Sequence, residues 1–114
     1  MKRALLVLVV AACDPAPMTI DQYPCPADGT MLTYDNFGAQ FLADHCNTCH
    51  SADYAARHGA PDSYRFDTLD EVHAHAPRIF VRAAGPNTSM PPGPYDPPLE
   101  DRERLAEWLA CGAP

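Results

Sequence analysis

The sequence predicts a single all-α domain, because helical spacing dominates the chain. Two stretches, one leading into residue 45 and one ending near residue 110, repeat apolar residues every three or four positions, the period of an amphipathic helix. Another helical stretch lies between them, and no run alternates apolar and polar residues as a strand does. At 114 residues and 46% hydrophobic content, the chain has room for one core.

The start of the chain has the pattern of an export signal. An apolar run from Ala4 to Ala12 follows Lys2 and Arg3; it is too short to span a bilayer but suits a secretory signal. Residues 1–12 are therefore predicted to be a signal peptide. Because small residues run directly up to Cys13, the segment resembles the lipobox of bacterial lipoproteins, in which this cysteine becomes the lipidated N-terminus. A plain secretory signal is the alternative.

Residues 13–32 are predicted to be a proline-rich tether, because they hold several prolines and little apolar periodicity. The folded domain is expected to occupy residues 33–114. With a lipid on Cys13, this domain would stand off the periplasmic side of a bacterial membrane, and acyl and diacylglyceryl chains together would anchor it stably.

The first helix of the domain is predicted to begin near Thr33 and to run into Cys46. Residues at helical spacing form its apolar face: Tyr34, Phe37, Gly38, Phe41, Leu42 and His45. Thr33 or Thr30 is the expected cap. Because glycine weakens a helix, Gly38 on this face indicates that another backbone approaches closely there.

The middle helical region is predicted to be capped by Asp67. Its apolar residues are Leu69, Val72, Ile79, Phe80 and Val81. Pro77 is expected to break the region into two pieces, because proline lacks the amide hydrogen that a helix interior needs. The last helix is expected to have Pro98 at its first position and to end at Gly112. Its apolar stripe comprises Leu105, Trp108 and Leu109.

The most specific motif is Cys46-Asn47-Thr48-Cys49-His50, because C-x-x-C-H is the attachment site of a c-type haem. Two thiols on one helical turn each form a thioether with a haem vinyl group, and the following histidine reaches the iron. A zinc site would need four ligands, and no second C-x-x-C completes one. A thioredoxin-like dithiol is expected near a βαβ pattern, and no strand-rich segment surrounds Cys46. One covalently bound haem c is therefore the expected cofactor.

The second axial ligand decides what the iron does. Met90 is the leading candidate, because it is the only methionine after His50 and the prolines around it restrict the backbone of its loop. The alternatives are His73 or His75 from the middle region, or an open position. The two remaining histidines are predicted to lie at the surface: His45 and His58.

Each of the five cysteines has an expected role, so no single thiol is left unassigned. Cys13 takes the lipid and two others take the haem, which leaves Cys25 and Cys111. An oxidising compartment outside the cytoplasm favours a disulfide between this pair. Two free buried thiols are the alternative.

The mature chain is strongly acidic. Without residues 1–12, six arginines face fifteen carboxylates, so the net charge is −9. Nucleic acid and anionic lipid surfaces are poor partners for such a chain. The charge indicates either a redox partner protein with a basic docking face or simply a need for solubility.

Residues 33–112 resemble a class I cytochrome c in the order of their parts. These are a helix leading into the motif, the middle helices, a Met-Pro loop and a last helix with an aromatic residue. The resemblance implies a small cytochrome c fold, with N- and C-terminal helices packed around a covalently bound haem. It also implies a set of haem contacts: thioethers from Cys46 and Cys49, and iron ligation by His50 and Met90.

That family packs a glycine and an aromatic residue of the first helix against an aromatic residue of the last. The matching positions here are Gly38, Phe41 or Leu42, and Trp108. The chain departs from mitochondrial members in having no ring of lysines at the haem edge, so the identity of the partner is not carried over.

The function expected from these observations is one-electron transfer at the outer face of a bacterial membrane. Two alternatives remain: a gas or redox sensor with a labile sixth ligand, and the electron-transfer subunit of a larger dehydrogenase. The chain alone is not expected to be an enzyme, because it has no carboxylate pair, Ser/His/Asp set or phosphate-binding glycine loop.

Overall fold

The computed structural model describes residues 16–114 of the chain. The predicted signal peptide and Cys13 lie outside the described residues, so both stay predictions. None of the helices within residues 16–114 is long and apolar enough to cross a membrane.

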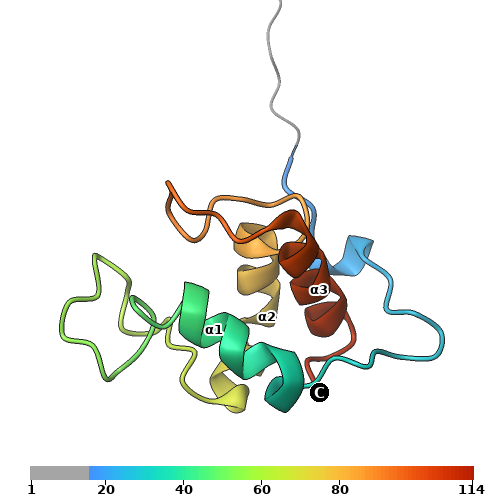
Figure 1. Ribbon diagram of the computed structural model, residues 1–114, viewed down its shortest axis with the longest axis horizontal. Coiled ribbons are helices and arrows are strands. Elements are labelled where there is room, and N and C mark those ends of the chain that lie inside the picture. Colours follow the sequence, from blue (N-terminus) through green and yellow to red (C-terminus); the bar gives the residue numbers. More distant parts are fainter. Residues whose placement is uncertain (1–15) are drawn as a thin grey trace, which may run out of the picture.

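The described residues form three α-helices and two short helical turns, and they contain no strand, as the sequence predicts (Figure 1). In chain order, these are the 3₁₀ turn η1 (Ile20–Gln22), the π-helical turn η2 (Tyr34–Gly38), α1 (Ala39–His45), α2 (Leu69–Ala83) and α3 (Leu99–Ala110). The helices enclose one core, to which all of them contribute buried side chains.

The turn η2 packs against α3 at the centre of the core. Gly38 is buried and lies so close to the indole of Trp108 that a Cβ at this position would overlap the ring. The expected close approach is therefore made by a side chain rather than by a backbone. The ring of Phe37 meets Trp108 edge-on with 6.1 Å between centroids, a contact that was not predicted. The predicted partners, Phe41 and Leu42, are buried in the same core.

Thr33 caps this first helical segment, one of the two predicted possibilities. Its hydroxyl accepts a hydrogen bond from the Asn36 amide at 3.1 Å. The Asn36 side chain accepts in return from the Thr33 amide at 2.7 Å, so two of the unpaired groups at the helix start are satisfied together.

The start of α2 differs from the prediction by one residue. Thr68, and not Asp67, is the cap: its hydroxyl accepts from the Glu71 amide while the Glu71 carboxylate accepts from the Thr68 amide. Asp67 is used elsewhere, because its carboxylate accepts from the amide of Ala52 at 2.8 Å.

Pro77 does not break α2, which is continuous from Leu69 to Ala83. The prediction of two pieces is therefore wrong. Apolar side chains on both sides of the proline are buried in the same core, with Val72 before it and Phe80 after it fully buried. Their burial offsets the hydrogen bond that proline cannot donate.

The last helix ends as its sequence predicts. Gly112 has a left-handed backbone with φ of +88°. Its amide donates to the Leu109 carbonyl and the next amide, that of Ala113, donates to the Trp108 carbonyl at 2.8 Å. This is a Schellman arrangement, which satisfies two carbonyls at the helix end. At the other end Pro98 occupies the cap position, so α3 begins at Leu99, one residue later than predicted.

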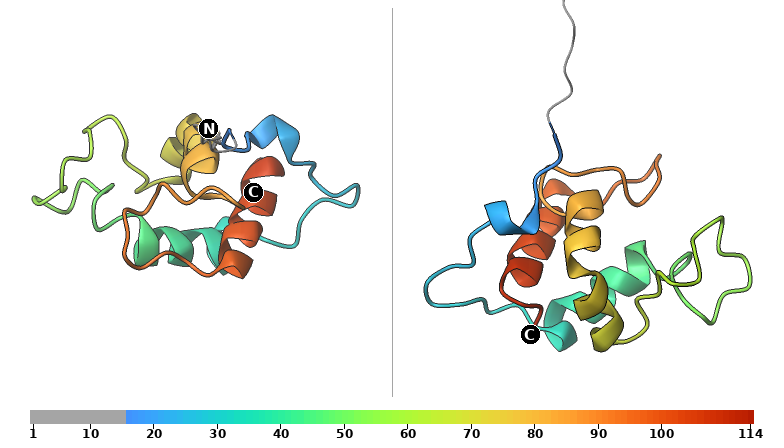
Figure 2. Two further views of the ribbon diagram at one scale, coloured as in Figure 1. Left: turned by 90° about the horizontal axis from the view of Figure 1, so that it is seen from above. Right: turned by 180° about the vertical axis from the view of Figure 1, so that it is seen from behind.

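Part of the segment predicted to be a tether is folded onto the domain. Met18, Ile20 and Tyr23 pack against the core, and η1 lies beside α3 (Figure 2). Cys25 is joined to Cys111 by a disulfide, the pairing favoured by the cysteine count. The apolar residues of this segment are too few to form a helical stripe, and contacts with α2 and α3 hold them in place.

Candidate functional site

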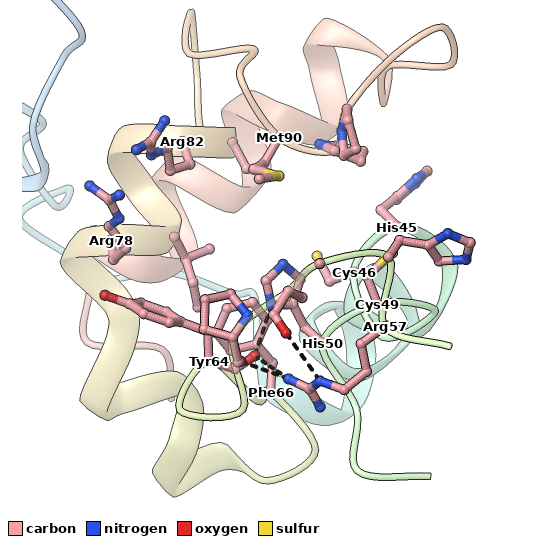
Figure 3. Close-up of a pocket in the computed structure, with 18 residues that line it drawn as sticks. His45, Cys46, Cys49, His50, Arg57, Tyr64, Phe66, Arg78, Arg82 and Met90 are labelled. Carbon is pink, nitrogen blue, oxygen red and sulfur yellow. Dashed lines mark hydrogen bonds between the residues drawn. The ribbon is translucent and has the colours of Figure 1, made fainter. Parts of the chain in front are cut away.

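A cavity of about 300 Å³ opens between the end of α1, the loop after it, one face of α2 and the loop that carries Met90 (Figure 3). Cys46, Cys49, His50 and Met90 all line it. Residues far apart in the sequence, from the C-x-x-C-H motif and from the Met-Pro loop, therefore meet at one site. Much of the remaining wall is apolar: Phe66, Ile79, Ala83, Pro91 and Pro92.

The motif lies on a helical turn that continues beyond the end of α1. The Cys46 amide donates to the Leu42 carbonyl at 2.9 Å, and the His50 amide donates to the Cys46 carbonyl at 3.0 Å. The second bond spans four residues, as in an α-helix. This turn brings both thiols and the imidazole to the same cavity.

The two motif cysteines are free thiols. Burial, and secondarily the neighbouring Cys49, raises the pKa of the Cys46 thiol to about 12. Cys46 also follows the C-terminal end of α1, where the helix dipole opposes a negative charge. A catalytic dithiol needs a lowered thiol pKa, so this environment argues against thioredoxin-like chemistry.

The imidazole of His50 is held in one orientation. Its Nδ1 lies 2.8 Å from the carbonyl oxygen of Tyr64, and its ring stacks on Phe66 with 4.6 Å between centroids. Because a carbonyl oxygen only accepts, Nδ1 carries the proton and donates it. The lone pair of Nε2 is therefore free for a metal, in the arrangement that metal-binding histidines commonly have.

Met90 reaches the cavity from the loop that follows α2. Figure 3 shows its side chain on the opposite side of the cavity from His50, with Cys46 and Cys49 on the histidine side. The Met90 amide donates to the carbonyl of Arg82 at 2.9 Å, which fixes the backbone of the loop to the end of α2. Met90 is 38% exposed.

Of the four histidines other than His50, only His45 differs from the prediction. His73 lies 2.9 Å from the Ala113 carbonyl, and His75 packs against the ring of Tyr64; neither lines the cavity. His45 and His58 do line it. His58 is exposed, as predicted, but His45 is half-buried against Phe41 with 4.9 Å between rings, because it completes the apolar face of α1.

The charges around the cavity have one sign. Three arginines line it and no carboxylate does, although the chain has fifteen carboxylates. Arg78 and Arg82 lie one turn apart on α2, and neither guanidinium has an ion pair or hydrogen bond to another described residue. Like charges at this spacing repel each other, so an anionic group between them would be stabilised.

The side chains of the cavity suit a haem better than a bare metal ion. Within residues 16–114, no three His, Cys, Asp or Glu side chains are grouped so that they could hold a metal ion. A haem supplies four equatorial nitrogen ligands itself, and needs from the protein only thiols, axial donors, apolar walls and partners for its propionates. All four features are present at this cavity.

Three contributors to the site were not predicted from the sequence: the Tyr64 carbonyl, the ring of Phe66 and the guanidinium of Arg57. The first is a backbone group that any residue type provides, so no sequence signal identifies it. No family model, no curated protein and no solved structure matches this chain, so the chemistry of the site is inferred from the side chains described here.

Proposed function

We propose that this chain is a monohaem c-type cytochrome that carries one electron at a time. The main support is that four side chains line one largely apolar cavity (Figure 3). Cys46, Cys49 and His50 lie on one side of it, and Met90 lies on the other. Covalent attachment needs the two thiols and the histidine, a methionine suits the iron as a second ligand, and the chain provides them from two segments about 40 residues apart.

Each side chain has a distinct task in this proposal. Cys46 and Cys49 would attach the haem through thioethers, and His50 would ligate the iron through Nε2 while its Nδ1–H donates to the Tyr64 carbonyl. Met90 would be the other protein ligand of the iron. The bound haem supplies a one-electron change between ferrous and ferric iron.

The cavity walls adjust the site without taking part in bond formation. Phe66 and Ile79 are buried, so they exclude water and disfavour the additional positive charge of ferric iron. Arg78 and Arg82 supply positive charge on α2, and we assign them to the haem propionates. A histidine-methionine ligand pair raises the reduction potential in the same direction as burial does.

The proposal includes a small cytochrome c fold over residues 33–114. It is supported by the all-α architecture and by Gly38, which admits the Trp108 ring between the first and last helical segments. It also includes a lipid on Cys13, which would hold the protein at the periplasmic side of a bacterial membrane. The mature charge of −9 favours a redox partner with a basic docking face.

The test is the visible spectrum of the mature protein, made with a haem-attachment system, in both redox states and with carbon monoxide. A six-coordinate low-spin spectrum that carbon monoxide does not change is expected. Met90→Ala should bind carbon monoxide rapidly, and Met31→Ala, at an exposed methionine outside the cavity, should not. Protein that carries no covalent haem after unfolding would refute the proposal.

One observation favours a second candidate, a gas or redox sensor. Met90 is 38% exposed, so water or a small ligand has access to its side chain. A sensor would bind carbon monoxide rapidly as the unmutated protein. The same spectrum therefore distinguishes the carrier from the sensor.

A further inference from the structure

The loop of residues 51–64 follows the motif on the way to α2 and has no helix or strand. It nevertheless ends in the Tyr64 carbonyl, which accepts a hydrogen bond from Nδ1 of His50. A segment without regular backbone pairing needs other partners to hold one carbonyl at 2.8 Å from an imidazole. The side chain of Arg57 provides such partners.

The guanidinium of Arg57 lies inside this loop and bonds to its backbone. It donates to the carbonyls of Ser51 and Pro61, both at 2.8 Å, and to that of Ala60 at 3.3 Å. A fourth contact, at 3.5 Å, joins one of its terminal nitrogens to the Tyr64 carbonyl (Figure 3). One side chain therefore fastens both ends of the loop to its middle.

The environment of Arg57 indicates that these carbonyls are its main partners. Its side chain is only 14% exposed, and its one ion-pair contact, to Asp62 at 3.6 Å, involves a carboxylate that is 82% exposed. An exposed carboxylate at that distance adds little. Arginine suits the position because its planar group directs five donors in fixed directions, which a lysine ammonium does not.

We propose that Arg57 is a positioning residue for the axial ligand His50. It acts through the Tyr64 carbonyl, which has two lone pairs and accepts from His50 with one and from Arg57 with the other. By fixing this oxygen, Arg57 fixes the proton on Nδ1 and the rotation of the ring. The proposal rests on the haem function proposed above.

The test uses the mature holoprotein and its Arg57→Met and Arg57→Lys variants. Nuclear magnetic resonance measures how fast the His50 Nδ1 proton exchanges with solvent in the ferrous state. The ferric haem-methyl shifts report the orientation of the histidine ring. Arg65→Met is the matched control: it removes the same charge from a neighbouring residue whose guanidinium contacts Asp62 and not the Tyr64 carbonyl.

Arg57→Met should speed the exchange by about tenfold, the effect of losing one charge-assisted hydrogen bond, and should change the spread of the methyl shifts. Arg57→Lys should also speed the exchange, since one ammonium does not reach four carbonyls. If Arg57→Met carries no haem, the exchange rate in Arg57→Lys tests the positioning role. Wild-type exchange and shifts in the Arg57 variants, or equal changes in Arg65→Met, would overturn the positioning role while the haem remains. Absence of covalent haem in the wild type would overturn the proposed function, and this role with it.

Discussion

The two loops that flank the cavity, residues 51–64 and residues 84–98, are both fastened by an arginine, but at different distances along the chain. Arg57 belongs to the first loop and donates to carbonyls three to seven residues away. Arg102 belongs to α3 and donates to the carbonyls of Pro97 and Gly85, the latter 17 residues away. The first loop is thus held from within, and the second by another helix.

The second loop also depends on the N-terminal segment. Asn87 is buried, with 6% exposure, and its side chain exchanges hydrogen bonds with the backbone of Met18, 69 residues away. The same side chain donates to the Phe80 carbonyl at 2.9 Å. The loop that carries Met90 is therefore joined to three separate parts of the chain.

This difference has a consequence for the two proposed axial ligands. The orientation of His50 is set by a short stretch of chain, whereas the position of Met90 is set by the assembled domain. Any change that loosens the packing of the domain should therefore weaken the methionine side first. The 38% exposure of Met90 is consistent with that order.

The largest effect is expected from a change in the core of the domain. Trp108→Ala removes a fully buried indole that packs on Gly38 and Phe37, so it should cost about 3–5 kcal/mol of unfolding free energy. Denaturant unfolding of the holoprotein measures it. Tyr95→Ala, at an aromatic that is 87% exposed, is the control and should change little. Similar losses in both variants would contradict a core centred on Trp108.

Removing the disulfide should affect the two loops differently. The variant Cys25→Ser/Cys111→Ser frees a link between residues 86 apart in sequence, which should cost about 2–4 kcal/mol of stability. The segment containing Met18 then loses an anchor, so the Met90 side should loosen while His50 keeps its local bonds. Unfolding midpoints and binding of external ligands to the haem measure both effects. A reductant should reproduce them in the unmutated protein, and an unchanged midpoint would argue against the link.

A smaller and more selective effect is expected from Arg102→Met. Loss of its bonds to Gly85 and Pro97 should free the Met90 loop, so imidazole should displace Met90 about tenfold faster in the ferric protein. Stopped-flow absorbance measures the rate. Arg104→Met, two residues further along α3, removes the same charge from an exposed pair with Asp101 and is the matched control. Equal rates in the two variants would mean that Arg102 does not hold the loop.

The smallest effect concerns the start of the 51–64 loop. A hydrogen bond with Ser51, aided by the Ala52 amide and nearby arginines, holds the pKa of Asp67 below its ordinary value of 3.8. Its contribution to stability is complete above that ordinary value and is lost as pH falls through the lower folded value. Asp67→Asn should flatten the acid side of the stability curve below about pH 4. The exposed Asp28→Asn should leave the curve unchanged, and a steep curve in Asp67→Asn would contradict the assignment.

Most helices were predictable from the sequence, because their signals are local. Apolar spacing identifies all three, Thr33 caps the first, and Gly112 ends the last with the backbone that glycine favours. Two errors in the helices were at Pro77, where burial on both sides outweighs a lost hydrogen bond, and at Asp67, whose carboxylate accepts from a loop amide. Both errors arise where a contact distant in sequence overrides a local preference.

The sequence by itself determined the all-α class and the C-x-x-C-H motif of residues 46–50, because helix periodicity and the spacing of two thiols and an imidazole are properties of neighbouring residues. Only the tertiary structure decided that Met90, rather than His73 or His75, lies in the cavity with His50. It also decided that Arg57 bonds to the Tyr64 carbonyl, the group that accepts from Nδ1 of His50. Those pairings depend on where loops without periodicity are held. Side chains such as Arg102 and Asn87 hold them by bonding to backbone carbonyls, which every residue possesses and no sequence pattern marks.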